Sequence, residues 1–306
     1  MKLKPESKSV SKPKLKQPTM TALTYKHLSA HLDKQEFVEG HVSFKTARQF
    51  SSIGTATSEQ LSQQDQRHEY FSELERKFGL VLGFMTNVSN VRTQVPILDV
   101  QTTLDIAEQL NIMHPRYEPR TNVSDENSGY QAAIMTTDFL FDYVDFSTGE
   151  IVTVAVSIKY SSEVSMLHGE DRVIQRTHDK FEIERCYWEN EHGNKFLVIT
   201  SGYWMFEKNL VDNLSIARVH RKLNIPPVLE TSLIVYFHEI LSVKQKMRLR
   251  LVDVIHSIAM KTNLPTDHLY SVFWNFVWTK KINVDLFKPL SSGEYVFNGE
   301  DFAWAW

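Results

Sequence analysis

The sequence predicts a mixed α/β domain followed by a second, mainly α-helical domain. Three patterns favour the first domain: an amphipathic helix over residues 69–85, a pair of strands over 134–144 and 151–159, and a helix at 172–191 that leads into an apolar strand at 195–200. Helices that alternate with strands in this way pack as layers around a sheet.

Composition limits the class of protein. The chain has 306 residues, 42% of them hydrophobic, and a net charge of −3, so overall charge makes no case for nucleic-acid binding. The single cysteine, Cys186, excludes an internal disulfide and a cysteine-based zinc cluster. No apolar run reaches the ~18 residues that would span a membrane. We expect a cytoplasmic protein without membrane contact.

Residues 1–20 are predicted to be a disordered basic arm. They carry six lysines against one glutamate, with three prolines, and too little apolar surface to fold alone. The arm could seek phosphate groups, but a solvated tail is the favoured interpretation. Residues 21–66 are polar and predict weak structure without chemistry.

The helix predicted over 69–85 places two acids differently. Glu73 lies opposite the apolar stripe and faces solvent, whereas Glu75 falls at the margin of the stripe and is predicted to be half buried. A half-buried acid needs a partner, either a cation or a metal ion. The simpler alternative is a bond to a nearby arginine. A strand that breaks at Pro96 follows, and residues 99–131, with one short helix and a polar loop, are interpreted as an insertion.

The strands at 134–144 and 151–159 are predicted to form a hairpin. The turn at 145–150 contains Gly149, which can take the left-handed conformation of a tight turn. Asp138 and Lys159 would then lie on adjacent strands. An aspartate, a hairpin and a strand that ends in lysine form the skeleton of a metal-dependent nuclease site, but a cross-strand ion pair would have the same pattern.

Residues 204–306 are predicted to form a winged-helix-like domain. The pattern consists of helices near 207–222, 243–260 and 268–279, an apolar segment at 228–241, and a strand over 280–286. Such a domain could contact DNA through its second helix and the Lys280–Lys281 pair, or use the same shape to hold a protein. The protein-binding interpretation is favoured because charge is nearly balanced, with 12 Lys+Arg against 10 Asp+Glu in 205–306, and because the end is rich in aromatics (Phe302, Trp304 and Trp306).

Other chemistries lack their sequence signals. The chain has no Walker A or GxGxxG loop, no HExxH zinc motif and no GxSxG nucleophile elbow.

With Glu75, Asp138 and Lys159 placed, the chain resembles the TnsA family, the endonuclease subunit of heteromeric bacterial transposases. The blocks that carry the resemblance occur in the family's order over about 130 residues. They are Ser72-Glu-Leu-Glu75, Val91-Arg-Thr-Gln-Val-Pro-Ile-Leu, Met135-Thr-Thr-Asp-Phe-Leu140, Val156-Ser-Ile-Lys159, Glu182-Ile-Glu-Arg-Cys-Tyr-Trp188 and Phe196-Leu-Val-Ile-Thr200.

The resemblance implies a restriction-endonuclease-like nuclease domain over residues 21–203, with its core at 69–203, before the winged-helix-like domain. It implies that Glu75 and Asp138 bind Mg²⁺ and that Lys159 completes the catalytic site. The general nuclease pattern has an acid two residues before the lysine. Here Ser157 stands at that position and is expected to line the site wall.

The resemblance also implies a reaction and partners. A TnsA subunit hydrolyses the 5′ strands at transposon ends, beside a TnsB-type DDE transposase that cuts and joins the 3′ strands. A TnsC-type ATPase regulator is expected to contact the C-terminal domain. Two alternatives stay open: a stand-alone restriction or repair nuclease, and a non-catalytic adaptor that binds the transposase and its regulator. Target selection, metal count and oligomeric state do not follow from the sequence.

Overall fold

The computed structural model describes residues 15–47, 56–60, 67–117, 131–165, 172–243, 249–290, 293–296 and 299. The predicted basic arm lies outside the described residues as far as residue 14, and so do Phe302, Trp304 and Trp306. Residues 15–20 pack on the domain: the Gln17 amide donates to the carbonyl of Ile112 at 2.6 Å and accepts from the backbone N–H of His114 at 3.0 Å. The predicted disorder therefore does not extend to them.

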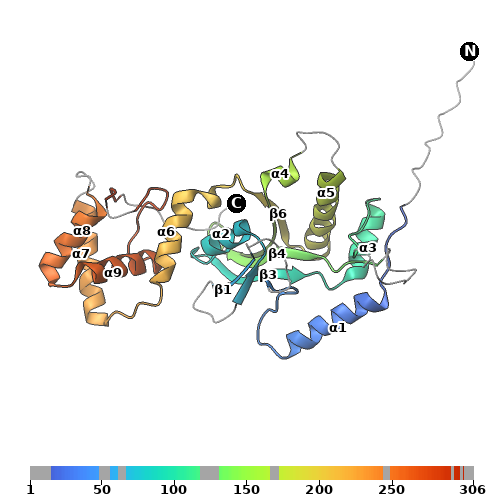
Figure 1. Ribbon diagram of the computed structural model, residues 1–306, viewed down its shortest axis with the longest axis horizontal. Coiled ribbons are helices and arrows are strands. Elements are labelled where there is room, and N and C mark those ends of the chain that lie inside the picture. The colour runs from blue at the N-terminus through green and yellow to red at the C-terminus, as the bar shows by residue number, and fades with distance from the viewer. Residues whose placement is uncertain are drawn as a thin grey trace, which may run out of the picture.

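A four-stranded mixed sheet forms the centre of the first domain (Figure 1). Its spatial order is β3 (Val88–Pro96), β4 (Thr136–Val144), β5 (Ile151–Lys159) and β6 (Lys195–Thr200). The first two pairings are antiparallel and the last is parallel. The predicted hairpin is therefore confirmed, although its first strand starts two residues later than expected.

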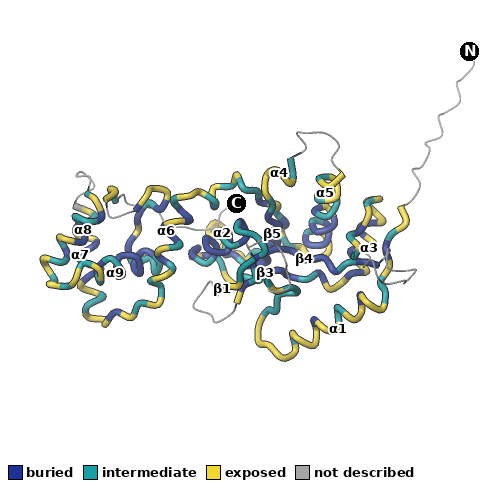
Figure 2. Tube along the Cα trace, viewed as in Figure 1, coloured by how far each residue is buried: buried dark blue, intermediate teal, exposed yellow. Residues whose placement is uncertain are grey.

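Helices cover both faces of this sheet because successive apolar residues of β4 point to opposite faces, and each face needs a covering layer. On one face, α2 (Glu73–Leu82) packs Phe78 against Phe139, with ring centroids 4.9 Å apart. On the other face, Leu140 joins a separate apolar cluster. That cluster is completed by α3 (Val100–Gln109), α5 (Arg172–Arg185) and the π-helix η3 (Cys186–Glu191). Figure 2 shows the strands buried between these layers. Whether 99–131 is an insertion remains a prediction, since 118–130 are not described.

Two short strands and a helix precede this core and correct the sequence prediction. Residues expected to begin the first long helix instead form β2 (Arg67–Tyr70), which pairs with β1 (Thr57–Gln60). The helix starts only after Ser72, whose hydroxyl caps it by accepting from the N–H of Glu75 at 3.1 Å. Residues 21–66 also contain a 15-residue helix, α1 (Ala22–Glu36). It has no apolar stripe to reveal it, because Leu23 and Leu32 are exposed.

The C-terminal part is mainly helical in its described residues. It contains the short η4 (Trp204–Phe206), then α6 (Lys208–Val219), α7 (Pro227–Val243), α8 (Leu251–Thr262) and α9 (Thr266–Trp278). In Figure 1, α6 lies beside α2, and α7, α8 and α9 lie beyond α6, away from the sheet. One apolar cluster runs without a break from Phe78 and Phe141 to Leu210 and Phe273, so the two domains share a core. None of the described helices, nor the short α4 (Ser161–Val164), is long and apolar enough to cross a membrane.

The predicted winged-helix pattern is not confirmed. The apolar segment 228–241 lies within α7, and the helix expected from residue 243 starts at Leu251, with 244–248 not described. Residues 280–286 form no strand. Ile282, Val284 and Leu286 are buried in the shared core, so their alternation reflects packing against helices rather than strand pairing.

The packing of α2 on β2 predicts a sharp difference between two glycines. An added Cβ at Gly79 would lie 2.5–2.8 Å from the buried ring of Tyr70, whereas one at Gly202 would meet nothing within 4 Å. We expect Gly79→Ala to lower the free energy of unfolding by about 1–3 kcal/mol. Gly202→Ala should change it by less than about 0.5 kcal/mol. Urea unfolding of both variants checks this, and equal stabilities would contradict the packing described.

Candidate active site

The site begins where β4 and β5 separate. Their pairing ends at Phe139–Val156, while β5 continues beside β6 as far as Lys159–Thr200. Beyond that fork, the N–H of Ile158 donates to Oδ2 of Asp138 at 2.7 Å. The aspartate thus replaces the lost strand partner, and its carboxylate is held at the open end of the sheet.

Lys159 approaches the same carboxylate, as the hairpin predicts. Its Nζ lies 3.8 Å from Oδ2 of Asp138, and the lysine side chain is 28% exposed. A separation of this length is a loose ion pair, weaker than a direct charged hydrogen bond. The lysine therefore neutralises part of the charge of Asp138 and still reaches solvent, where a substrate could meet it.

Glu75 is more deeply buried than predicted, with 5% of its surface exposed. Its Oε2 accepts from the N–H of Phe71 at 2.9 Å and from Nε2 of Gln94 at 3.0 Å, and its Oε1 accepts from the hydroxyl of Ser72 at 2.9 Å. The alternative of an arginine partner is wrong. Arg76 instead pairs with Glu73, with Nη2 and Oε1 2.7 Å apart.

Gln94 is a site residue that the sequence prediction missed. It lies on β3 between the Thr93–Phe139 and Val95–Thr137 pairs, which places it beside Asp138. Its φ of +51° is left-handed, which costs a non-glycine residue about 1–3 kcal/mol. It is also 1% exposed. The only sign of Gln94 in the sequence was a polar residue next to the apolar end of a predicted strand. In the structure, its left-handed backbone directs the side-chain amide to Glu75.

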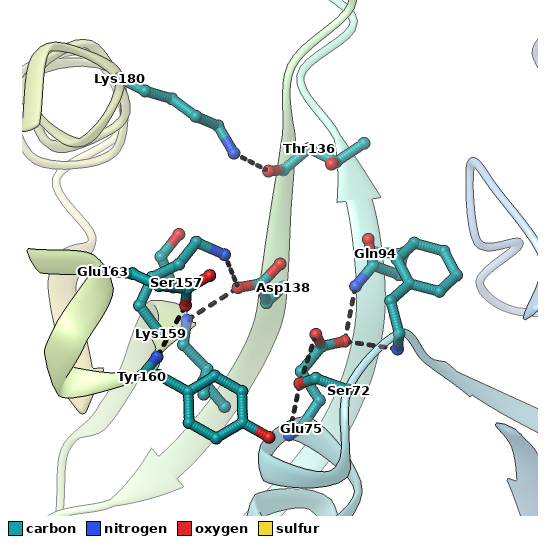
Figure 3. A network of polar contacts seen from close by, with 12 residues as sticks. Ser72, Glu75, Gln94, Thr136, Asp138, Ser157, Lys159, Tyr160, Glu163 and Lys180 are labelled. Atoms are coloured by element: carbon teal, nitrogen blue, oxygen red, sulfur yellow. Dashed lines mark hydrogen bonds and ion pairs between the residues drawn. The ribbon is translucent and has the colours of Figure 1, made fainter. Parts of the chain in front are cut away.

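The side chains converge on a polar pocket of about 260 Å³ (Figure 3). The figure shows Glu75 and Asp138 side by side, with Gln94 next to the first and Lys159 next to the second. The lining is completed by residues from five segments: Lys45, Phe71, Ser72, Leu74, Thr136, Ile158, Tyr160 and Glu163. Lys45 lies within residues 21–66, which were predicted to carry no chemistry. No sequence pattern there marked it as a site residue.

Ser157 does not line this pocket as expected. Its hydroxyl turns to α5, where it donates to Oε2 of Glu184 at 2.6 Å. Glu184 is fully buried and is paired with Lys180, whose Nζ lies 3.1 Å from Oε1. The serine therefore connects β5 to α5, behind the pocket.

The two pocket carboxylates repel each other. Burial and, after it, the neighbouring Asp138 carboxylate together raise the pKa of Glu75 from its ordinary value of 4.5 to about 7, although the hydrogen bonds from Phe71 and Ser72 act in the opposite direction. A divalent cation between the carboxylates would relieve this repulsion. The donors fit such an ion because they are hard oxygens in an open polar pocket.

In the part of the chain that the structure describes, no group of three or more His, Cys, Asp or Glu side chains is arranged to hold a metal ion. Besides Glu75 and Asp138, the predicted pair of ligands, Glu163 lines the pocket, and its Oε2 accepts from the N–H of Tyr160 at 2.8 Å. Mg²⁺ typically binds through one or two carboxylates and completes its shell with water and substrate phosphates. The pair is sufficient for that kind of site.

A mixed sheet with helices on both faces, and two acids and a lysine at a strand fork, defines a restriction-endonuclease-like nuclease domain. Residues 86–201 match the family model described as TnsA-like endonuclease N terminal. The chain therefore carries a TnsA-like endonuclease domain, which supports the predicted family, and the predicted mixed α/β fold is confirmed. The match includes Asp138 and Lys159 but begins after Glu75. No curated protein matches the sequence.

The match also defines the activity at a coarse level. The domain is that of a DNA endonuclease of a Tn7-like transposition system. The roles of individual residues stay predictions.

The burial of Glu75 predicts a pH dependence of folding. Because its folded pKa is raised, the native state holds this proton more tightly than the unfolded chain. The protonated Glu75 therefore contributes to the free energy of unfolding fully below pH 4.5, and this contribution is lost as the pH rises through about 7. The loss is on the order of 3 kcal/mol. Urea unfolding in metal-free buffer should show this loss in the wild type. In Glu75→Gln the loss should be absent, and an equal loss in both proteins would contradict the prediction.

Proposed function

We propose that this protein is the Mg²⁺-dependent endonuclease that hydrolyses the 5′ strands at transposon ends. The observation that carries the proposal is the convergence of Glu75, Asp138 and Lys159, from three separate elements, in one polar pocket of a TnsA-like endonuclease domain. A pocket in which carboxylates and an ammonium meet is suited to a phosphodiester, whose hydrolysis needs a cation and a positioned water.

Each of the three residues has its own role in the proposed reaction. Glu75 and Asp138 would hold Mg²⁺, and the bound ion would supply a water molecule of lowered pKa and a positive charge beside the scissile phosphate. The backbone N–H groups of Phe71 and Ile158 hold the two carboxylates in place before the metal arrives. Lys159, loosely paired and partly exposed, orients the attacking water or stabilises the charge that develops on the phosphate.

The proposal extends to partners. The DNA is a transposon end, a TnsB-type DDE transposase cuts and joins the 3′ strands, and a TnsC-type ATPase contacts the C-terminal helices. Two observations support a protein-binding role for these helices. Val219, Val228 and Met260 are 76–88% exposed there. Lys280 lies over the ring of Phe84 at 4.5 Å and Lys281 is paired with Glu230, so both contact the protein itself.

Strand-resolved cleavage tests the central claim. With a transposon-end duplex, the partner transposase and Mg²⁺, the wild type should cut the 5′ strand. We expect Asp138→Ala to reduce that cut at least about 100-fold, because a ligand that positions charge in the transition state is lost. The cut on the 3′ strand should persist.

The matched control for this cleavage experiment is Asp105→Ala, on the exposed side of α3 in the same domain. It should cleave like the wild type. If Asp138→Ala also yields the same products as the wild type, the ion pair is structural and the chain acts as an assembly adaptor.

Metal binding can be tested without DNA. Saturating Mg²⁺ should raise the melting temperature of the wild type, by about 2–4 °C for each kcal/mol of binding free energy. We expect Glu75→Gln and Asp138→Asn to lose this shift. Glu73→Gln is the matched control, because Glu73 lies on the same helix but pairs with Arg76. An equal shift in all four proteins would place the metal elsewhere.

A further inference from the structure

The segment 41–47 is fastened along β3 beside the pocket. The ring Nε2 of His41 donates to the carbonyl of Thr93 at 2.7 Å, and the hydroxyl of Ser43 donates to the same carbonyl at 2.9 Å. The N–H of Phe44 donates to the carbonyl of Gln94 at 3.1 Å. These bonds to two consecutive residues of β3 fix the backbone immediately before Lys45.

Lys45 is thereby brought into the lining of the catalytic pocket with Glu75, Asp138 and Lys159. Its side chain is partly buried. Burial lowers the pKa of Lys45, and the nearby Lys180 ammonium lowers it further. Lys180 is itself paired with Glu184. DNA phosphate is the anion that the proposed function would bring to the Lys45 ammonium.

The pocket carboxylates have other partners. Asp138 accepts from Ile158 and pairs with Lys159, while Glu75 accepts from Phe71, Ser72 and Gln94. Lys45 lines the same pocket as these acids. Its segment lies on β3 and Lys159 lies on β5, with Asp138 on the strand between them. A phosphate held over Asp138 would meet one lysine from each side.

We propose that Lys45 is a DNA-binding residue of this active site, whose ammonium contacts a phosphate oxygen of the strand that enters the pocket. This inference rests on the proposed function and deepens it, because it assigns to an N-terminal segment outside the matched 86–201 region a direct contact with the substrate. The contact is with phosphate, so it contributes affinity without sequence preference.

The test is the salt dependence of DNA binding in EDTA, where cleavage cannot occur. Fluorescence anisotropy with the full chain and a labelled transposon-end duplex gives the slope of log K against log[salt]. Losing one phosphate contact should lower the magnitude of that slope by roughly 0.9 in Lys45→Gln. Lys45→Arg, which keeps the charge, should retain the slope. Lys261→Gln, on α8 and paired with Glu239, is the control that should also retain it.

Each outcome decides the inference. A reduced slope in Lys45→Gln alone, with an unchanged melting temperature, supports a phosphate contact. The inference is overturned if the wild type and Lys45→Gln have equal slopes, whether or not the melting temperature of the variant is lower. It is also overturned if the wild type does not bind DNA. Failure of the proposed function has a different signature, because a wild type that binds DNA but leaves the 5′ strand intact with Mg²⁺ is not the nuclease proposed.

Discussion

The repulsion between two carboxylates in one partly enclosed pocket is the constraint on which this structure depends. Glu75 and Asp138 come from a helix and a strand far apart in sequence, and holding them together has a cost: burial and, after it, the neighbouring Asp138 carboxylate raise the pKa of Glu75 to about 7. The cost is offset by donors aimed at the carboxylate oxygens, namely two backbone N–H groups and the side chains of Ser72 and Gln94. In the proposed function, a divalent cation would offset this cost, because it would favour the ionised form of Glu75 and relieve the repulsion from Asp138.

The architecture supplies those donors through two irregularities. The fork between β4 and β5 frees the N–H of Ile158 for Asp138, which a continuous ladder would have used between strands. The left-handed φ of Gln94 turns the amide on β3 toward Glu75. Both lie at one end of a sheet whose other positions are closely packed by apolar residues. Regular packing on both faces therefore provides the rigidity that lets the open end keep its strained geometry.

The C-terminal helices are part of the same core rather than an appended module. The apolar cluster that packs α2 on the sheet continues into α6 and α9, so the helix that begins just before Glu75 is braced from both sides. A partner that binds the exposed surface of these helices would be mechanically connected to the catalytic helix. The same sharing explains why 280–286 resembles a strand, since its alternating apolar residues are buried against helices.

The sequence by itself determined the hairpin, the helix at 172–191, a helix within the predicted range 69–85, and the approach of Asp138 to Lys159. These features follow from local periodicity and from the geometry of a short turn. The mixed α/β class and the TnsA resemblance followed from the same blocks. Only the tertiary structure decided the depth of Glu75, the strained Gln94 and the arrival of Lys45 in the pocket. It also decided that Ser157 faces Glu184 and that residues 280–286 form no wing. These features depend on contacts between segments that are distant in sequence. A local sequence pattern does not indicate which distant residue a side chain will contact.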